Sequence, residues 1–249
     1  MTNSPRVSLV IPARYRSSRF PGKPLAPIAG VSLVRRVWER CTRAVDQADV
    51  HVATDDERIA DHCRSFGANV IMTSEACLTG TDRVAEAARS LAADVILNVQ
   101  GDEPLIEPGD VRAVLEGFLA RPAAVACGMC PIESMEDYES RTVPKVVTRP
   151  DGTLLYMSRA PIPASKVRGL PTCRRQVCIY AFGPGHLAAF AAAGRKTPLE
   201  EIEDIEILRF LESGTEIRMV ELGPGSVAVD VPADVARVEA LLASRRGAA

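Results

Sequence analysis

Two adjacent carboxylates, Asp102 and Glu103, follow directly on an apolar run and are well placed to do chemistry. The run Val95–Val99 has the composition of a buried strand, and Gly101 and Pro104 are strong breakers of regular structure. Asp102 is therefore expected just past the carboxyl end of a central strand, where ligands bind in open α/β sheets. A carboxylate there is a natural ligand for Mg²⁺, which in turn holds phosphates. The alternative is an acidic turn with no chemistry.

A basic loop near the start of the chain could face this carboxylate. Val7–Ile11 predicts a short strand, and residues 12–24 form a loop with three prolines, one glycine and four cations, which are Arg14, Arg16, Arg19 and Lys23. The loop lacks the Gly-x4-Gly-Lys-Ser/Thr pattern of a Walker A motif. Its side chains and backbone N–H groups are nevertheless suited to cradling a triphosphate. A solvated basic loop is the alternative, and the stiffening by proline and glycine disfavours it.

Strand and helix patterns alternate through the first half of the chain. This order predicts an α/β fold with a mostly parallel, doubly wound sheet that carries helices on both faces. The expected strands are 50–53, 69–72 and 95–99, and the expected helices are 32–45, the segment ending at Gly67, the segment capped by Thr81 or Asp82 and running to Leu91, and 108–119.

The pattern changes after about Val125, where short strand candidates follow one another without long helices between them. These are 124–130, 145–148, 154–158 and 177–182, followed by helices at 186–193 and 203–212, strands at 216–221 and 226–230, and a closing helix at 232–244. We expect a single domain over residues 1–249, with an inserted mixed β subregion at about 124–200.

Composition excludes several classes of protein. The net charge is −2 and the cations are dispersed, so we expect no nucleic-acid partner. No apolar run approaches the length of a membrane span, and the first residues lack the apolar region of a signal peptide, so we expect no membrane partner. Seven scattered cysteines suit the reduced thiols of a cytoplasm.

A zinc site is the alternative use of the cysteines. Cys127 and Cys130 form a CxxC pair, and Cys173 and Cys178 lie downstream. The pair falls in a predicted strand, where residues three apart point to opposite faces, and the second pair has the wrong spacing for a zinc knuckle. Buried cysteines acting as small hydrophobes are the favoured interpretation.

Several motifs, taken together and in order, resemble the 3-deoxy-manno-octulosonate (Kdo) cytidylyltransferase family, also called CMP-Kdo synthetases. The resemblance covers almost the whole chain. The motifs are IPARYxSxRxPGKP at 11–24, ATD at 53–55, TGTDR at 79–83, NVQGDEP at 98–104, YMSRAPIP at 156–163, Ile179-Tyr180, PLExIE at 198–203 and Val229-Asp230.

The resemblance implies a fold of the nucleotide-diphospho-sugar transferase or GT-A type, and a cytoplasmic, Mg²⁺-dependent homodimer of lipopolysaccharide biosynthesis. It also implies that the subregion at about 124–200 binds the acceptor and mediates dimerisation. Its substrates would be CTP and an acidic sugar acceptor, a 3-deoxy-2-ulosonic acid, and pyrophosphate would be released. The implied nucleotide-binding residues are Pro12, Ala13, Arg14, Ser17, Ser18, Lys23, Arg83 and Gln100; Lys23, Arg14 and Asp102 would be catalytic; Asp102 and Asp230 would ligate Mg²⁺; Arg159, Gln176, Tyr180, Glu203 and Ile207 would line the acceptor site.

The acceptor half departs from the family pattern as it stands in this sequence. Gln176 replaces an expected His, Cys178 and Ala181 replace Gly, Ile207 replaces Gln, and SVAVDV at 226–231 replaces GTGVDT. Gln176 and Tyr180 share a face of one strand, and Ile207 lies four residues after Glu203 on a predicted helix, so both replacements are expected in the pocket wall. The acceptor could then be Kdo, an amino-Kdo, another ulosonic acid or a different anion.

Two functions from other classes stay open. A GT-A glycosyltransferase shares the nucleotide-binding architecture, but it usually carries an Asp-x-Asp pair where this chain has Asp102-Glu-Pro104. A catalytically silent nucleotide-binding protein is disfavoured because Lys23, Asp102 and Asp230 are all present.

Overall fold

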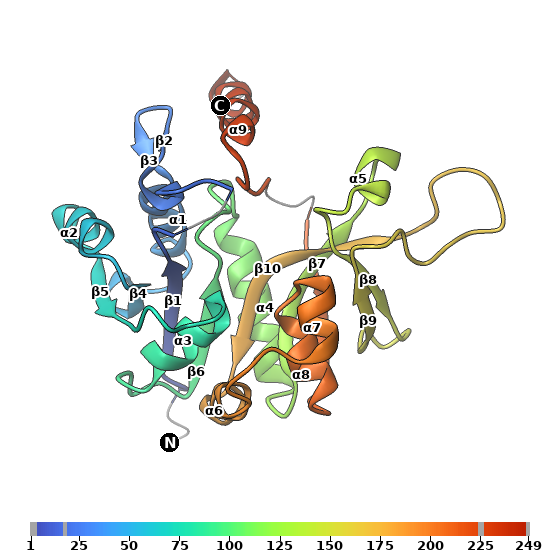
Figure 1. Cartoon of the computed structure of the whole chain (residues 1–249), viewed down its shortest axis with the longest axis horizontal. Coiled ribbons are helices and arrows are strands. Elements are labelled where there is room, and N and C mark those ends of the chain that lie inside the picture. The colour runs from blue at the N-terminus through green and yellow to red at the C-terminus, as the bar shows by residue number, and fades with distance from the viewer. Residues whose placement is uncertain (1–3, 17–18, 224–226, 248–249) are drawn as a thin grey trace.

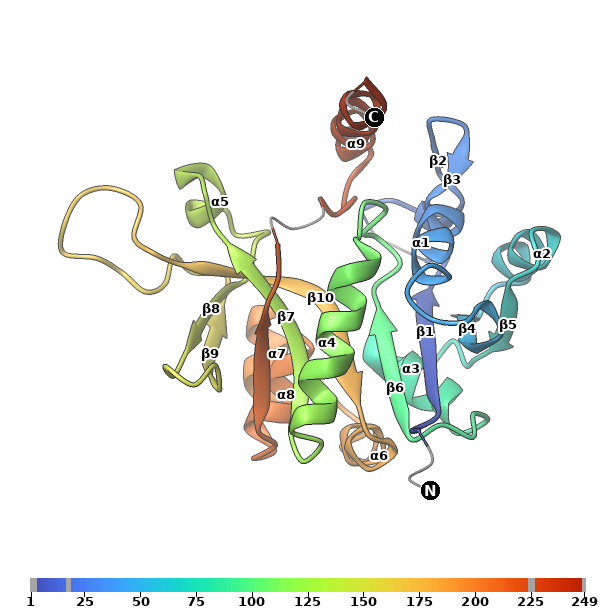
Figure 2. The ribbon, with the colours of Figure 1, turned by 180° about the vertical axis from the view of Figure 1, so that it is seen from behind.

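The architecture is a mixed sheet with helices on both faces, seen in a computed structural model that describes residues 4–16, 19–223 and 227–247 (Figure 1). The main sheet has the strand order β11-β7-β10-β6-β1-β4-β5. Helices α3, α6, α7 and α8 lie in front of the sheet in Figure 1, whereas α1 and α4 lie in front in the reverse view (Figure 2). Two apolar clusters fill the two helix–sheet layers.

The amino-terminal half is the predicted parallel α/β unit. Strands β1 (Val7–Ala13), β4 (Val50–Thr54), β5 (Asn69–Met72) and β6 (Val95–Val99) pair in parallel. They alternate with α1 (Leu33–Cys41), α2 (Glu57–Ser65), α3 (Gly80–Ala88) and α4 (Pro108–Ala120). On β6, Val95, Leu97 and Val99 face one apolar cluster and Ile96 faces the other, as period-two alternation requires of a strand covered on both sides.

The second half completes the same sheet. Strand β10 (Arg174–Phe182) runs antiparallel to β6 and to β7 (Val125–Pro131), and β11 (Ile217–Glu221) pairs in parallel with β7. Among the described strands, four of the six pairings along the main sheet are therefore parallel.

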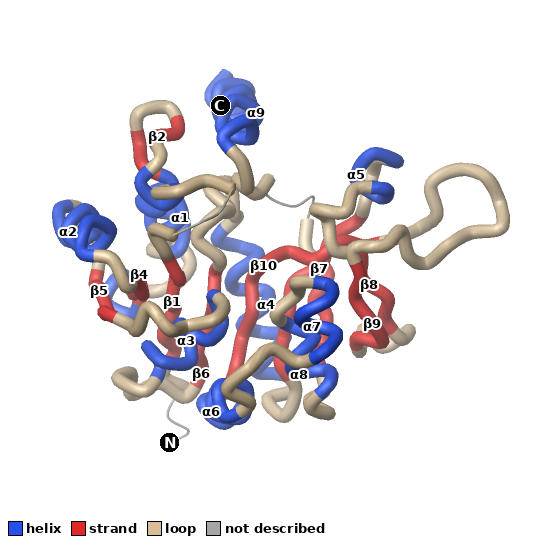
Figure 3. Tube along the Cα trace, in the orientation of Figure 1, coloured by secondary structure: helices blue, strands red, loops and turns tan. Residues whose placement is uncertain are grey.

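The predicted subregion at about 124–200 is only partly separate from this sheet. Strands β7 and β10 belong to the sheet itself, while the β8–β9 hairpin (Lys145–Thr148 and Leu154–Ser158), α5 (Met135–Glu139) and the loop 159–173 project from it. The loop is the long tan segment that extends away from the body in Figure 3.

Several predicted elements change at their ends. Helix α1 ends at Cys41 rather than 45, and Thr79 caps α3 in place of Thr81 or Asp82, since its side chain accepts from the Asp82 N–H. No strand forms in the described residues 227–230. The remaining elements are η1 (Lys23–Leu25), β2 (Pro27–Ile28), β3 (Val31–Ser32), η2 (Gln47–Asp49), α6 (Pro184–Ala192) and α9 (Pro232–Gly247).

The predicted helix 203–212 is wrong, because the chain breaks there into two helices. Helix α7 (Pro198–Glu203) and α8 (Ile207–Glu212) are separated by Asp204, which has a left-handed backbone with φ of 51°. An aspartate tolerates this conformation better than most residues. The break redirects the segment 204–206 toward the carboxyl ends of the sheet strands, with consequences for the site.

Candidate active site

A cavity of about 530 Å³ lies across the carboxyl ends of β1 and β6 and one face of β10. Its volume falls in the range of about 300–1,000 Å³ that is usual for small-molecule sites. The loop after β1, the turn after β6, the start of α3, β10 and the segment before α9 all contribute to its walls. The position is the one predicted for ligands in an open α/β sheet.

Two glycines allow the backbone segments of this cavity to approach one another. A Cβ added at Gly101 would lie 2.8 Å from the carbonyl oxygen of Pro12, and one added at Gly80 would lie 2.8 Å from the side-chain amide of Gln100. At Gly101 the contact is with backbone, so a larger residue would separate the turn from the loop, whereas at Gly80 a larger residue would displace the Gln100 side chain. The glycines of the motifs at 79–83 and 98–104 therefore have a packing role at the site.

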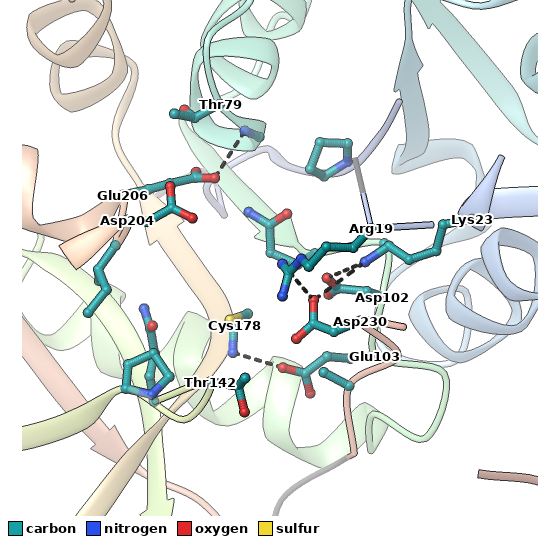
Figure 4. Close-up of a pocket in the computed structure, with 18 of the residues that line it drawn as sticks. Arg19, Lys23, Thr79, Asp102, Glu103, Thr142, Cys178, Asp204, Glu206 and Asp230 are labelled. Atoms are coloured by element: carbon teal, nitrogen blue, oxygen red, sulfur yellow. Dashed lines mark hydrogen bonds and ion pairs between the residues drawn. The ribbon is translucent and has the colours of Figure 1, made fainter. Parts of the chain in front are cut away.

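Two carboxylates that are far apart in the sequence converge on one lysine (Figure 4). The Nζ of Lys23 lies 2.9 Å from Asp102 Oδ2 and 3.9 Å from Asp230 Oδ1, and it donates to the Val229 carbonyl at 2.9 Å. The Arg19 guanidinium contacts Asp230 Oδ1 at 3.2 Å. A backbone hydrogen bond of 2.8 Å from Val229 N to Asp102 O fixes the two segments side by side.

The carboxylate pair fits a hard divalent cation. The Lys23 ammonium already occupies the position of a cation between Asp102 and Asp230, and both carboxylates reach the cavity. Two protein oxygens suit Mg²⁺, which keeps waters and takes phosphate oxygens for its other positions. Among the described residues no cluster of three or more His, Cys, Asp or Glu side chains could hold a metal, and all seven cysteines are free thiols.

Most of the predicted nucleotide-binding residues line the cavity, and the wall that they form is called the nucleotide end below. They include Pro12, Ala13, Arg14, Lys23, Arg83 and Gln100. Arg83 is 3% exposed, and its guanidinium contacts Asp55 at 3.2 Å and also donates to the Thr73 hydroxyl. These two contacts fix the position of the Arg83 guanidinium. Ser17 and Ser18 lie outside the described residues.

Gln176 and Tyr180 also line the cavity and share one face of β10, as predicted, and the wall around them and Arg159 is called the acceptor end below. The Gln176 Nε2 donates to the Tyr180 hydroxyl at 3.0 Å. The pairing of β10 with β7 shifts between Val177 and Tyr180, and the irregularity brings Cys178 to the cavity wall. Burial and the neighbouring carboxylates raise the pKa of the Cys178 thiol, so it stays protonated.

Arg159 lines the cavity, but its guanidinium is directed at backbone carbonyls. It donates to Glu203 O, to Asp204 O at 2.8 Å, and to Arg141 O and Thr142 O at 3.0 and 3.3 Å. The predicted fork to an acceptor carboxylate is therefore not free in this arrangement. Arg159 instead holds two segments of the cavity wall together.

Glu203 and Ile207 do not line the cavity, which corrects their predicted place in the pocket wall. The Glu203 carboxylate accepts hydrogen bonds from the Ser158 hydroxyl at 2.6 Å and from the Arg159 backbone N–H at 2.9 Å. Ile207 is 1% exposed in an apolar cluster. The prediction assumed one continuous helix, and the break at Asp204 removes the one-turn spacing on which it depended.

Comparison with known proteins identifies the family. A cytidylyltransferase family model matches residues 8–217. A 3-deoxy-manno-octulosonate cytidylyltransferase of Geobacter metallireducens is 44% identical over 246 residues, covering 94% of this chain and 96% of its own. One from Anaeromyxobacter dehalogenans is 47% identical over 243 residues, covering 96% and 98%. A solved CMP:2-keto-3-deoxy-manno-octonic acid synthetase complexed with CTP is 37% identical, with a TM-score of 0.89, covering 96% and 99%. The chain belongs to the 3-deoxy-manno-octulosonate cytidylyltransferase family.

Membership makes the protein a nucleotidyltransferase and confirms the predicted family and the GT-A-like fold.

Glu206 also lines the cavity, although the sequence analysis did not single it out. Its carboxylate accepts from the N–H groups of Gly80 at 3.1 Å and Thr81 at 2.7 Å, at the amino end of α3. Burial raises its pKa, and those hydrogen bonds oppose the rise. Acidic residues also stand at 201, 203 and 204, so the sequence could not indicate which one faces the cavity.

Proposed function

We propose that this cytidylyltransferase joins CTP to Kdo or a Kdo-like 3-deoxy-2-ulosonic acid, giving the CMP-sugar and pyrophosphate. The observation that carries the proposal is the convergence of Lys23 with Asp102 and Asp230 at the junction of a nucleotide end and an acceptor end of one cavity. The names of the relatives and of the CTP-bound structure support both substrates.

The reaction is an in-line displacement at the α-phosphorus of CTP. The anomeric hydroxyl oxygen of the acceptor forms a bond to phosphorus as the bond to the pyrophosphate oxygen breaks, and the hydroxyl proton leaves to solvent. Such chemistry depends on positioning and on neutralising charge. Lys23 and Arg14 supply fixed positive charge to the triphosphate. When bound by Asp102 and Asp230, Mg²⁺ would withdraw charge from the phosphates.

The direct test is pyrophosphate release on mixing the protein with CTP, Mg²⁺ and Kdo, followed by a panel of amino-Kdo and other ulosonic acids. Turnover with one of these acids supports the proposal. A glycosyltransferase would instead release a nucleotide from a nucleotide sugar, and a silent binding protein would give no product. Absence of pyrophosphate with every acid would overturn the proposed function.

CTP is expected to be used at least about a hundredfold better than UTP. The Pro12 and Ala13 backbone and the Gln100 amide line the base end of the cavity. Cytosine presents an amine donor where uracil presents a carbonyl oxygen, so a site built for one leaves polar groups unpaired with the other. Steady-state kcat/KM for both nucleotides at saturating acceptor measures the ratio. Equal values would favour a broader nucleotidyltransferase.

Gln176→Leu is expected to raise the acceptor KM about tenfold while the CTP KM stays unchanged, because one lost hydrogen bond in a closed site costs about 1–2 kcal/mol. The Gln176 amide lies at the acceptor end, and its Nε2 orients the Tyr180 hydroxyl. Of the two replacements predicted in the pocket wall, Gln176 lines the cavity and Ile207 does not, so Gln176 is the one of the two expected to influence acceptor choice. An unchanged acceptor KM, with native thermal stability, would contradict its placement in the acceptor site.

Dimerisation and location in the cytoplasm belong to the same proposal. Leu155, Val167 and Leu170 are exposed apolar side chains on the projecting hairpin and loop, at 49%, 77% and 37%, and these side chains could be covered by a second copy. The free cysteines suit a reducing compartment. No helix in the described ranges is both long and apolar enough to span a bilayer. Light scattering after size exclusion would measure the oligomeric state.

A further inference from the structure

An ion pair lines the acceptor end of the cavity and is not part of the site described so far. Lys196 Nζ lies 3.0 Å from Asp204 Oδ1, and both side chains line the cavity. Lys196 stands just before α7, and Asp204 is the left-handed residue that ends it. The lysine side chain is sheltered at 23% exposure, whereas the aspartate side chain is 71% exposed.

Neighbouring charged groups at this end are tied to the backbone. The Arg159 guanidinium donates to carbonyl oxygens, among them Asp204 O, and the Glu206 carboxylate accepts from the α3 amides. A substrate could displace these groups only by breaking several hydrogen bonds inside the fold. An ion pair with one exposed member contributes little stability, typically about 0–1 kcal/mol, so its partner can be exchanged.

Asp204 faces the region of Lys23 and the two converging carboxylates. Figure 4 shows Asp204 beside Glu206, across the cavity from Lys23 and Asp102, with Arg19 between them. Burial opposes the charged form of Asp204, but the hydrogen bond from Lys196 and the positive charges of Arg159 and Arg19 outweigh it and lower the pKa of Asp204. The positive charge of Arg19 thus favours the ionised form of Asp204, and the same guanidinium contacts Asp230, one of the two carboxylates proposed to bind Mg²⁺.

We propose that Lys196 binds the carboxylate of the acidic sugar acceptor in exchange for Asp204, and so helps to select an anionic acceptor. The inference rests on the proposed cytidylyltransferase function. An ammonium has three donors, and one of those of Lys196 is directed at Asp204. An incoming carboxylate takes the place of the exposed Asp204 oxygen, and Asp204 turns to solvent. The pair therefore keeps the lysine charged and in place while the site is empty.

The exchange predicts opposite effects for its two members. Lys196→Met should raise the acceptor KM about tenfold, since a charge-assisted hydrogen bond is lost, with kcat and the CTP KM within about twofold of wild type. Lys196→Arg should restore most of the affinity. Asp204→Asn should lower the acceptor KM about two- to threefold, because it removes a competing carboxylate, and Asn accepts the left-handed backbone equally well.

Arg195→Met is the matched control, because it removes the same charge one residue away from an exposed side chain that does not line the cavity. It should leave the acceptor KM unchanged. A raised CTP KM in Lys196→Met would mean that the lysine binds nucleotide phosphate and would overturn the inference. So would a raised acceptor KM in Asp204→Asn, which would make Asp204 itself the sugar ligand.

Measurements on the wild type distinguish a failure of the proposed function from a failure of the Lys196 inference. If it releases pyrophosphate with no ulosonic acid, the proposed function fails. If it turns over normally and Lys196→Met has the wild-type acceptor KM, the proposed function stands and this inference alone fails. Thermal melting of each variant shows that the fold is intact.

Discussion

Asp102→Asn is expected to lower kcat/KM by about a thousandfold, the loss that follows when several kcal/mol of charge stabilisation are removed from a phosphoryl-transfer transition state. Asp102 is one of the two carboxylates that converge on Lys23, at 2.9 Å. Asparagine keeps its volume and the backbone carbonyl that accepts from Val229 N, but not the charge. Without that charge the site would lose a proposed Mg²⁺ ligand and the electrostatic attraction that holds Lys23.

The fold should tolerate this change. The Lys23–Asp102 pair is partly open to solvent, at 18% and 27% exposure, so the free energy of unfolding should change by no more than about 1 kcal/mol. Asp94→Asn is a suitable control, because it removes a carboxylate paired with Arg6 at the surface, away from the cavity. Pyrophosphate release across an Mg²⁺ titration provides the measurement. Near-normal turnover of Asp102→Asn at saturating Mg²⁺ would show that Asp102 does not ligate the metal.

Arg209→Met is expected to give the largest loss of stability, about 3–5 kcal/mol, because it leaves a buried carboxylate without its partner. Arg209 is 1% exposed and bonds both oxygens of Glu200, which is 0% exposed, at 2.6 and 2.7 Å. It also contacts Asp82 at 2.7 Å and stacks on the Phe190 ring at 3.7 Å. One side chain therefore joins α8 to α7, α3 and α6.

Urea denaturation of Arg209→Met and of the double variant Arg209→Met/Glu200→Gln tests the origin of the loss. The double variant should recover part of the stability, because the second change removes the stranded charge. The single variant should also raise the acceptor KM, since the α8–α3 contact positions Glu206 at the amino end of α3. A destabilisation below about 1 kcal/mol would mean that the buried network does not hold these helices.

The sequence alone was sufficient for the parallel half of the sheet and for the place of Asp102. Helix and strand periodicity is a local property, so the strand at 95–99 can be recognised from its apolar run and the breakers after it, without knowledge of distant contacts. Lys145–Thr148 and Leu154–Ser158 were predicted with their observed bounds for the same reason. The ordered motifs indicated the family, because glycines at 80 and 101 and carboxylates at strand ends have physical roles that restrict substitution.

The tertiary structure decided which side chains form the acceptor end. An acidic, helix-forming stretch from 200 to 206 has no local signal that fixes a break at Asp204. The break is stabilised by distant groups, since Arg159 donates to the carbonyls of Glu203 and Asp204. Those long-range hydrogen bonds turn Asp204 and Glu206 into the cavity and leave Glu203 and Ile207 outside it, because the conformation of a short segment follows its tertiary partners rather than its own propensity.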